Sequence, residues 1–103
     1  RDLVRSRGLG DVYKRQVIGD MCIINTGAIV EHDCQVGDFS HISVGTVLCG
    51  EVKVGRSVLV GANATVVQCT TIGDKSTIGA GTTIRRDVKA HSIAWSGEKV
   101  KQL

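Results

Sequence analysis

Three histidines, at positions 32, 41 and 91, are the residues of this chain best suited to acid–base chemistry. His32 differs from the others because it stands between Glu31 and Asp33. A histidine beside a carboxylate is a general-base arrangement, since the acid fixes the imidazole tautomer and stabilises the imidazolium. Spacing alone leaves two interpretations of His32 open: a catalytic base, or an ordinary outward-facing residue.

Zinc ligation is a second chemistry that histidines permit. Trimeric β-helix carbonic anhydrases typically use a close histidine pair, five residues apart, plus a third histidine. The histidines of this chain show no such pair, and its cysteines form no C-x-x-C motif. The sequence therefore predicts no metal. It favours reduced thiols in a cytoplasmic protein, with structural packing roles for Cys22 and Cys34.

A strict period of six residues indicates the elements that must position these side chains. The aliphatic members of the repeat are Ile18, Ile24, Val30, Val36, Ile42, Leu48, Val54, Val60, Val66, Ile72, Ile78 and Ile84. A small or β-branched residue follows four places later in every hexad, from Cys22 to Val88. This period fits neither an α-helix nor a long strand, but a short strand followed by a corner. The predicted fold is all-β: a left-handed parallel β-helix over residues 17–89, with three hexads per triangular coil and about four coils.

Stacking at eighteen-residue intervals predicts three corner columns. The first corner column is polar: Gly19-Asp20, Gly37-Asp38, Gly55-Arg56 and Gly73-Asp74. The second is Thr26-Gly27, Val44-Gly45, Ala62-Asn63 and Ala80-Gly81, whose Gly and Asn suit positive φ. The third is His32-Asp33, Gly50-Glu51, Gln68-Cys69 and Arg86-Asp87. Gly50 is thus expected directly beneath His32. The second column is either a smooth groove for a long ligand or simply a set of tight corners.

Bulk composition excludes some functions and suggests a partner chain. Residues 1–16 hold five basic and two acidic residues, so they account for the whole net charge of +3 and weaken a nucleic-acid-binding interpretation. They lack the repeat and are predicted to be a non-native or disordered segment. No apolar run is long enough for a membrane span. Aromatic residues are only 3%, which predicts a thin core and help from a second chain.

Two segments carry a resemblance to a known family. They are INTGAIVEHDC at residues 24–34 and VGDFSHIS at residues 36–43. Both closely resemble the sialic acid O-acetyltransferase family, which includes bacterial enzymes that N-acetylate UDP-linked 4-amino sugars. The resemblance extends over residues 17–89 without an evident gap.

The resemblance implies an acetyl-CoA-dependent acetyltransferase acting on a sialic acid or a nucleotide-linked amino sugar. It also implies a homotrimer with sites between neighbouring prisms. His32 matches the family's catalytic base, and Asp33 the acid that orients it. His41 matches a histidine near the thioester of acetyl-CoA, and Asn25 an asparagine near the reacting groups and the substrate.

The resemblance extends less securely to the cofactor groove, where the register places Gly50, Ala62 and Ala80. Two departures from the family pattern stand out. The N-terminal half that holds the sugar in relatives has no counterpart here, and residues 94–99 lack the proline of the usual turn near adenine. Trp95 in that stretch either covers the last coil or stacks on adenine, and residues 90–103 are predicted to form a cap or tail. A non-catalytic scaffold and a β-helix carbonic anhydrase remain the alternatives.

Overall fold

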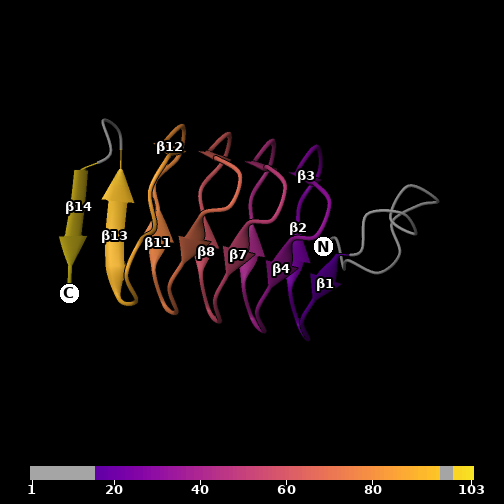
Figure 1. The fold of residues 1–103 in the computed structure, drawn as a ribbon, viewed down its shortest axis with the longest axis horizontal. Helices are drawn as coiled ribbons and strands as arrows, with labels where there is room; N and C mark the ends of the chain where they lie inside the picture. The colour runs from indigo at the N-terminus through magenta and orange to yellow at the C-terminus, as the bar shows by residue number, and fades with distance from the viewer. Residues whose placement is uncertain (1–15, 96–98) are drawn as a thin grey trace.

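A computed structural model describes residues 16–95 and 99–103 of the chain. These residues form twelve two-residue strands and two four-residue strands, arranged as a stack of triangular coils (Figure 1). Their principal extents are 38 × 22 × 20 Å. The fold confirms the predicted left-handed parallel β-helix of about four coils.

Three sheets form the sides of the prism. The first sheet contains β1 (Val17–Ile18), β4 (Gln35–Val36), β7 (Lys53–Val54) and β10 (Thr71–Ile72). The second contains β2 (Ile23–Ile24), β5 (His41–Ile42), β8 (Leu59–Val60), β11 (Thr77–Ile78), β13 (Ser92–Trp95) and β14 (Lys99–Gln102). The third contains β3 (Ile29–Val30), β6 (Val47–Leu48), β9 (Thr65–Val66) and β12 (Thr83–Ile84). The first corner column joins the first and second sheets, the second joins the second and third, and the third joins the third and first.

The strand register confirms the predicted eighteen-residue coil. Parallel pairing places Val36 beside Ile18, and Val54 beside Val36. Eleven of the twelve repeat aliphatics are buried, and Ile18 on the first coil is partly buried. Because each turn adds one layer of inward side chains, the core is a continuous ladder along the prism axis.

The small residues of each hexad do more than fill the narrow interior. Ser40 Oγ donates to the carbonyl of Gly55 at 2.7 Å and accepts from the Val58 N–H at 3.1 Å. Thr46 Oγ1 donates to the Gly61 carbonyl in the same way, at 2.8 Å. These hydroxyl groups bond backbone groups at the corners that do not take part in the hydrogen bonds of the sheets. The small size of the residues at these positions does not by itself predict such bonds.

Every corner of the three columns except Arg86-Asp87 contains a residue with left-handed backbone conformation. The second corner column confirms the expected positive φ at Gly27, Gly45, Asn63 and Gly81. The other two columns place larger residues there, including Asp33 at 58° and Phe39 at 64°. The Phe39 N–H donates to the Asp20 carbonyl and the Glu51 N–H to the His32 carbonyl, each at 2.9 Å. Such bonds between coils offset the roughly 1–2 kcal/mol that a non-glycine residue loses in this conformation.

Beyond residue 89 the chain continues the second sheet. Strand β13 pairs in parallel with β11, which buries Ala94 above Ile78, and β14 then returns antiparallel as a hairpin (Figure 1). The expected cap is thus an extension of one side of the prism. The segment predicted to be non-native or disordered, residues 1–16, lies outside the described residues except for Gln16. Within the described part of the chain, no helix has the length and apolar character needed to cross a membrane.

Candidate active site

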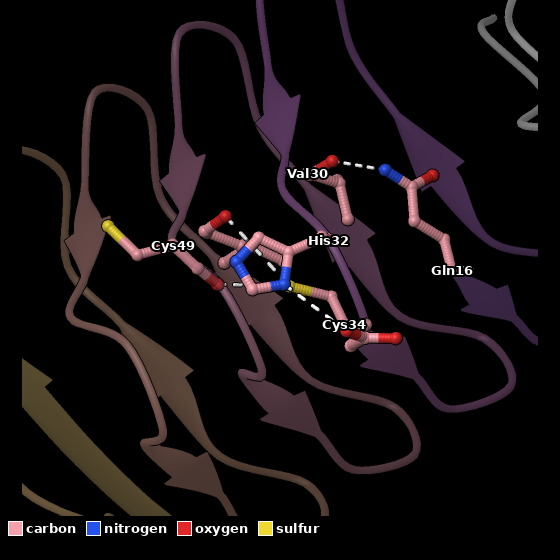
Figure 2. Close-up of polar contacts among 7 residues, drawn as sticks. Gln16, Val30, His32, Cys34 and Cys49 are labelled. Atoms are coloured by element: carbon pink, nitrogen blue, oxygen red, sulfur yellow. Dashed lines mark hydrogen bonds and ion pairs between the residues drawn. The ribbon is translucent and has the colours of Figure 1, made fainter. Parts of the chain in front are cut away.

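His32 lies in the third corner column, at the outer edge between the third and first sheets (Figure 2). Its Nδ1 is 3.2 Å from Oδ2 of Asp33, and its side chain is 57% exposed. The left-handed conformation of Asp33, with φ of 58°, accompanies this contact between adjacent residues. A carboxylate at Nδ1 favours the tautomer whose Nε2 is free to accept a proton.

Gly50 lies beneath the His32 imidazole, as the eighteen-residue register predicts. A Cβ placed on Gly50 would be 2.7 Å from Cε1 and 3.1 Å from Cδ2 of His32. The imidazole therefore covers the glycine and occupies the space that a side chain would take. Any other residue at position 50 would displace the ring.

His41 and Asn25 form a second polar pair, on the outer surface of the second sheet. His41 begins β5, and Asn25 follows β2 one coil earlier. Asn25 Nδ2 is 3.1 Å from His41 Nε2. The structure therefore brings together two residues that the sequence associated separately with the cofactor and the substrate.

The His32–Asp33 pair and the Asn25–His41 pair do not meet within one prism. The third corner column, with His32, joins the third and first sheets, whereas His41 lies on the second sheet. In the triangular cross-section of the prism, the second sheet is the side opposite the third corner column. A site that uses both histidines requires a second copy of the chain.

Side-chain carboxylates bond two backbone N–H groups of the first corner column. In the first column, Asp38 Oδ1 accepts from the Asp20 N–H at 2.8 Å, and Asp74 Oδ1 from the Arg56 N–H at 2.9 Å. The first column is therefore not merely solvated, because its carboxylates satisfy its own backbone.

The three residues predicted to line the cofactor groove have no side-chain acceptor of this kind for their N–H groups. Within the described residues, no acceptor lies within bonding reach of the N–H groups of Gly50, Ala62 and Ala80. Beside them, a Cβ on Gly81 would meet no atom within 4 Å. The N–H groups of Gly50, Ala62 and Ala80 thus stay open to a ligand, as do those of Asp38 and Asp74 in the first column.

The buried cysteines are structural. Cys34 Sγ lies 3.0 Å from the Cys49 carbonyl (Figure 2). Cys22 Sγ lies 3.1 Å from the Gly37 carbonyl. Burial raises the pKa of both thiols. A thiol that stays protonated is a poor nucleophile. Among the described residues, no group of three His, Cys, Asp or Glu side chains is placed to hold a metal ion.

A polar hollow of about 340 Å³ adjoins the His32 edge on the first sheet. Its lining residues are Asp33, Gln35, Glu51, Lys53, Cys69 and Thr71. Because Asp33 both lines the hollow and contacts His32, a polar molecule in it lies beside the histidine. Sequence reasoning missed this feature, since it arises where corner side chains project over a flat sheet.

Trp95 lies on the outer surface of the second sheet. The side chain of Ala94 is buried, and the next side chain along β13 points the opposite way, so that Trp95 is 39% exposed. A Cβ on Gly79 would be 3.2 Å from Trp95 Cβ. Trp95 therefore covers Gly79 from outside and does not close the end of the prism.

Comparison with known proteins supports the architecture and the repeat. Residues 51–86 match the family model "Bacterial transferase hexapeptide (six repeats)". One similar structure is a histidine-to-alanine mutant of GDP-perosamine N-acetyl transferase from Caulobacter crescentus in complex with CoA and GDP-perosamine. It has 38% identity and a TM-score of 0.82, over 84% of this chain and 41% of that one.

Another similar structure is the acetyltransferase domain of PglB from Neisseria gonorrhoeae in complex with acetyl coenzyme A. It has 35% identity and a TM-score of 0.76, over 86% of this chain and 46% of that one. The chain therefore spans less than half the length of either protein. The repeat over residues 51–86 thus matches that of bacterial hexapeptide transferases, and the fold of this chain is similar to that of both acetyltransferases.

Proposed function

We propose that this chain carries the catalytic and cofactor-binding part of an acetyl-CoA-dependent acetyltransferase whose acceptor is a hydroxyl or amine of a sugar. The observation that carries the proposal is the exposed His32 imidazole, held by Asp33 and lying over Gly50. Two similar proteins with 35% identity or more are acetyltransferases in complex with CoA or acetyl-CoA, and one of these complexes contains GDP-perosamine.

The proposed reaction is direct acyl transfer. The acceptor nitrogen or oxygen attacks the thioester carbonyl, and His32 Nε2 takes the acceptor's proton. The bond from carbon to sulfur then breaks, and the proton passes to the departing CoA thiolate. Asp33 keeps the Nδ1 proton in place and stabilises the imidazolium. General-base help of this kind contributes on the order of 10²–10⁴ in rate.

The open backbone donors suit the cofactor and the transition state. The Gly50 N–H belongs to the corner directly beneath His32, so it is a candidate donor to the oxyanion. The N–H groups of Ala62 and Ala80 are free to bond amide carbonyls of the pantetheine arm. Only small side chains stand beside them, so a long chain can approach the backbone closely.

The hollow on the first sheet suits a hydroxyl-rich acceptor. Carboxylates of Asp33 and Glu51 attract an ammonium group, and the Lys53 ammonium attracts a phosphate. An amino sugar bearing a nucleotide presents both charges. An acceptor in this hollow would lie beside His32.

A homotrimer would complete the site. Exposed aliphatic side chains gather along the second and third sheets and the corner column between them: Ile29, Val44 and Leu59. The outward residues of the first sheet beyond Val17 are polar: Gln35, Lys53 and Thr71. Threefold packing of the second sheet of one copy against the third sheet of the next buries apolar side chains of both faces, and the proposed cofactor groove beside Ala62 and Ala80 then runs between the copies. Since His32 stands at the outer end of the third sheet, this packing brings it towards His41 of a neighbouring copy.

The decisive experiment is a measurement of acetyl transfer by the protein. Release of CoA is measured with acetyl-CoA and amino-sugar nucleotides, in the unsubstituted protein and in His32→Ala. We expect turnover to fall by at least about 10²-fold while the oligomer and the CoA affinity are retained. Equal turnover in His32→Ala and in the unsubstituted protein would show that His32 is not the base. Absence of CoA binding to the unsubstituted protein would favour a scaffold.

A further inference from the structure

We propose that Asn25 is a positioning residue that fixes the tautomer of His41, so that His41 presents its Nδ1–H as a hydrogen-bond donor on the second sheet. The observation is the contact between Asn25 Nδ2 and His41 Nε2 at 3.1 Å. The structural part of this inference is independent of the reaction. Its catalytic consequence rests on the acetyltransferase function proposed above.

Hydrogen-bond chemistry determines the direction of this contact. The side-chain amide nitrogen of asparagine has two protons and no lone pair to offer, so it can only donate. His41 Nε2 must therefore accept. A neutral imidazole has one donor and one acceptor nitrogen, so the ring proton resides on Nδ1.

The surroundings make this pair stable and accessible. Asn25 and His41 belong to adjacent coils of the second sheet, where Ile23 pairs with His41. The Asn25 N–H bonds the Ile42 carbonyl at 2.9 Å, so the backbone of Asn25 is anchored to the residue after the histidine. Both side chains are partly exposed. The coils thus hold the amide against one ring nitrogen and leave the other for a ligand.

This arrangement differs in kind from that of His32. At His32 a carboxylate, which can only accept, engages Nδ1 and leaves Nε2 as a base. At His41 an amide donor engages Nε2 and leaves Nδ1–H as a donor. The two histidines thus have complementary tautomers: one removes a proton, and the other donates to an oxygen such as the thioester carbonyl of the cofactor.

Nitrogen-15 NMR of the imidazole rings tests the inference directly, because protonated and unprotonated ring nitrogens have well-separated chemical shifts. In the unsubstituted protein, at a pH where His41 is neutral, we expect a protonated Nδ1 and an unprotonated Nε2. In Asn25→Asp the new carboxylate can only accept, so the proton should move to Nε2. Asn63→Asp adds the same charge at a corner of the third coil and should leave the His41 shifts unchanged.

Activity provides a second measurement. If His41 Nδ1–H stabilises the oxyanion, Asn25→Asp should lower kcat by about 10²-fold, with a smaller effect on the KM for acetyl-CoA. A protonated Nε2 in the unsubstituted protein, or an unchanged tautomer in Asn25→Asp, would overturn the inference. If the unsubstituted protein transfers no acetyl group, the proposed function fails, and the NMR result still decides the role of Asn25.

Discussion

At the scale of single residues, a contact between neighbouring coils determines how His32 is held. The imidazole rests on a glycine, and its Nδ1 faces the adjacent carboxylate. The sequence could predict this column, because equal coils bring residues eighteen apart into contact. It could not predict the partner of His41, since the pairing with Asn25 depends on the side-chain torsions of both residues and spans sixteen positions.

Gly50→Ala tests how His32 is positioned. The added methyl group would lie 2.7 Å from Cε1, so the imidazole must move. On the proposed role of His32 as the base, we expect kcat/KM to fall about 10²-fold, because displacement of the base by about 1 Å costs that much. Steady-state kinetics, with circular dichroism to verify folding, measures the effect.

Gly79→Ala is the matched control for that substitution. Its added methyl group would face Trp95 Cβ at 3.2 Å, away from both histidines. Equal losses of activity in the two variants would mean that Gly50 has no special role beside His32.

At the scale of the strands and corners, the small residues of the repeat are hydrogen-bonding elements as well as space fillers. The sequence indicated their size and inward direction, and the burial of Ser40 and Thr46 confirms both. Their bonds to the carbonyls of Gly55 and Gly61 appear only in the structure. The physical reason is that a corner turns carbonyls away from the ladder, and where they point depends on the turn geometry.

Ser40→Ala should therefore destabilise the solenoid more than its loss of volume suggests. The substitution leaves the Gly55 carbonyl and the Val58 N–H without their hydroxyl partner. Orphaned buried groups cost about 1–3 kcal/mol. Urea denaturation at fixed protein concentration measures the change in the free energy of unfolding.

The partly exposed Ser43 provides the control for Ser40. Ser43→Ala should change the free energy of unfolding by no more than about 0.5 kcal/mol. Equal effects at the two positions would show that the Ser40 hydroxyl bonds contribute nothing to stability.

At the scale of the whole molecule, one prism has two chemically different kinds of side. The first sheet is largely polar, whereas exposed aliphatic residues gather on the other two. The thin core predicted from composition pointed to a partner chain, and these faces supply a surface for it. In the proposed trimer, each site would be shared between two copies, because His32 and His41 lie on opposite sides of one prism.

Leu59→Lys tests the association. Leu59 is 42% exposed on β8, next to His41 on β5. A lysine in an apolar interface must desolvate its charge without a partner, which is strongly unfavourable. We expect trimers to dissociate into monomers in analytical ultracentrifugation, with loss of acetyl transfer.

Gln35→Lys introduces the same charge on the first sheet and should leave the association state unchanged. An intact trimer in Leu59→Lys would place the interface elsewhere on the prism. Dissociation of Gln35→Lys would point to the first sheet instead.

The sequence by itself determined the period, the inward ladder and the stacking of His32 on Gly50. Each depends only on residue spacing, because residues eighteen apart are neighbours in space in a solenoid of equal coils. The tertiary structure alone decided which corner amides stay open and that Asn25 meets His41. Those features depend on side-chain directions and on turn geometry, which a one-dimensional repeat does not encode.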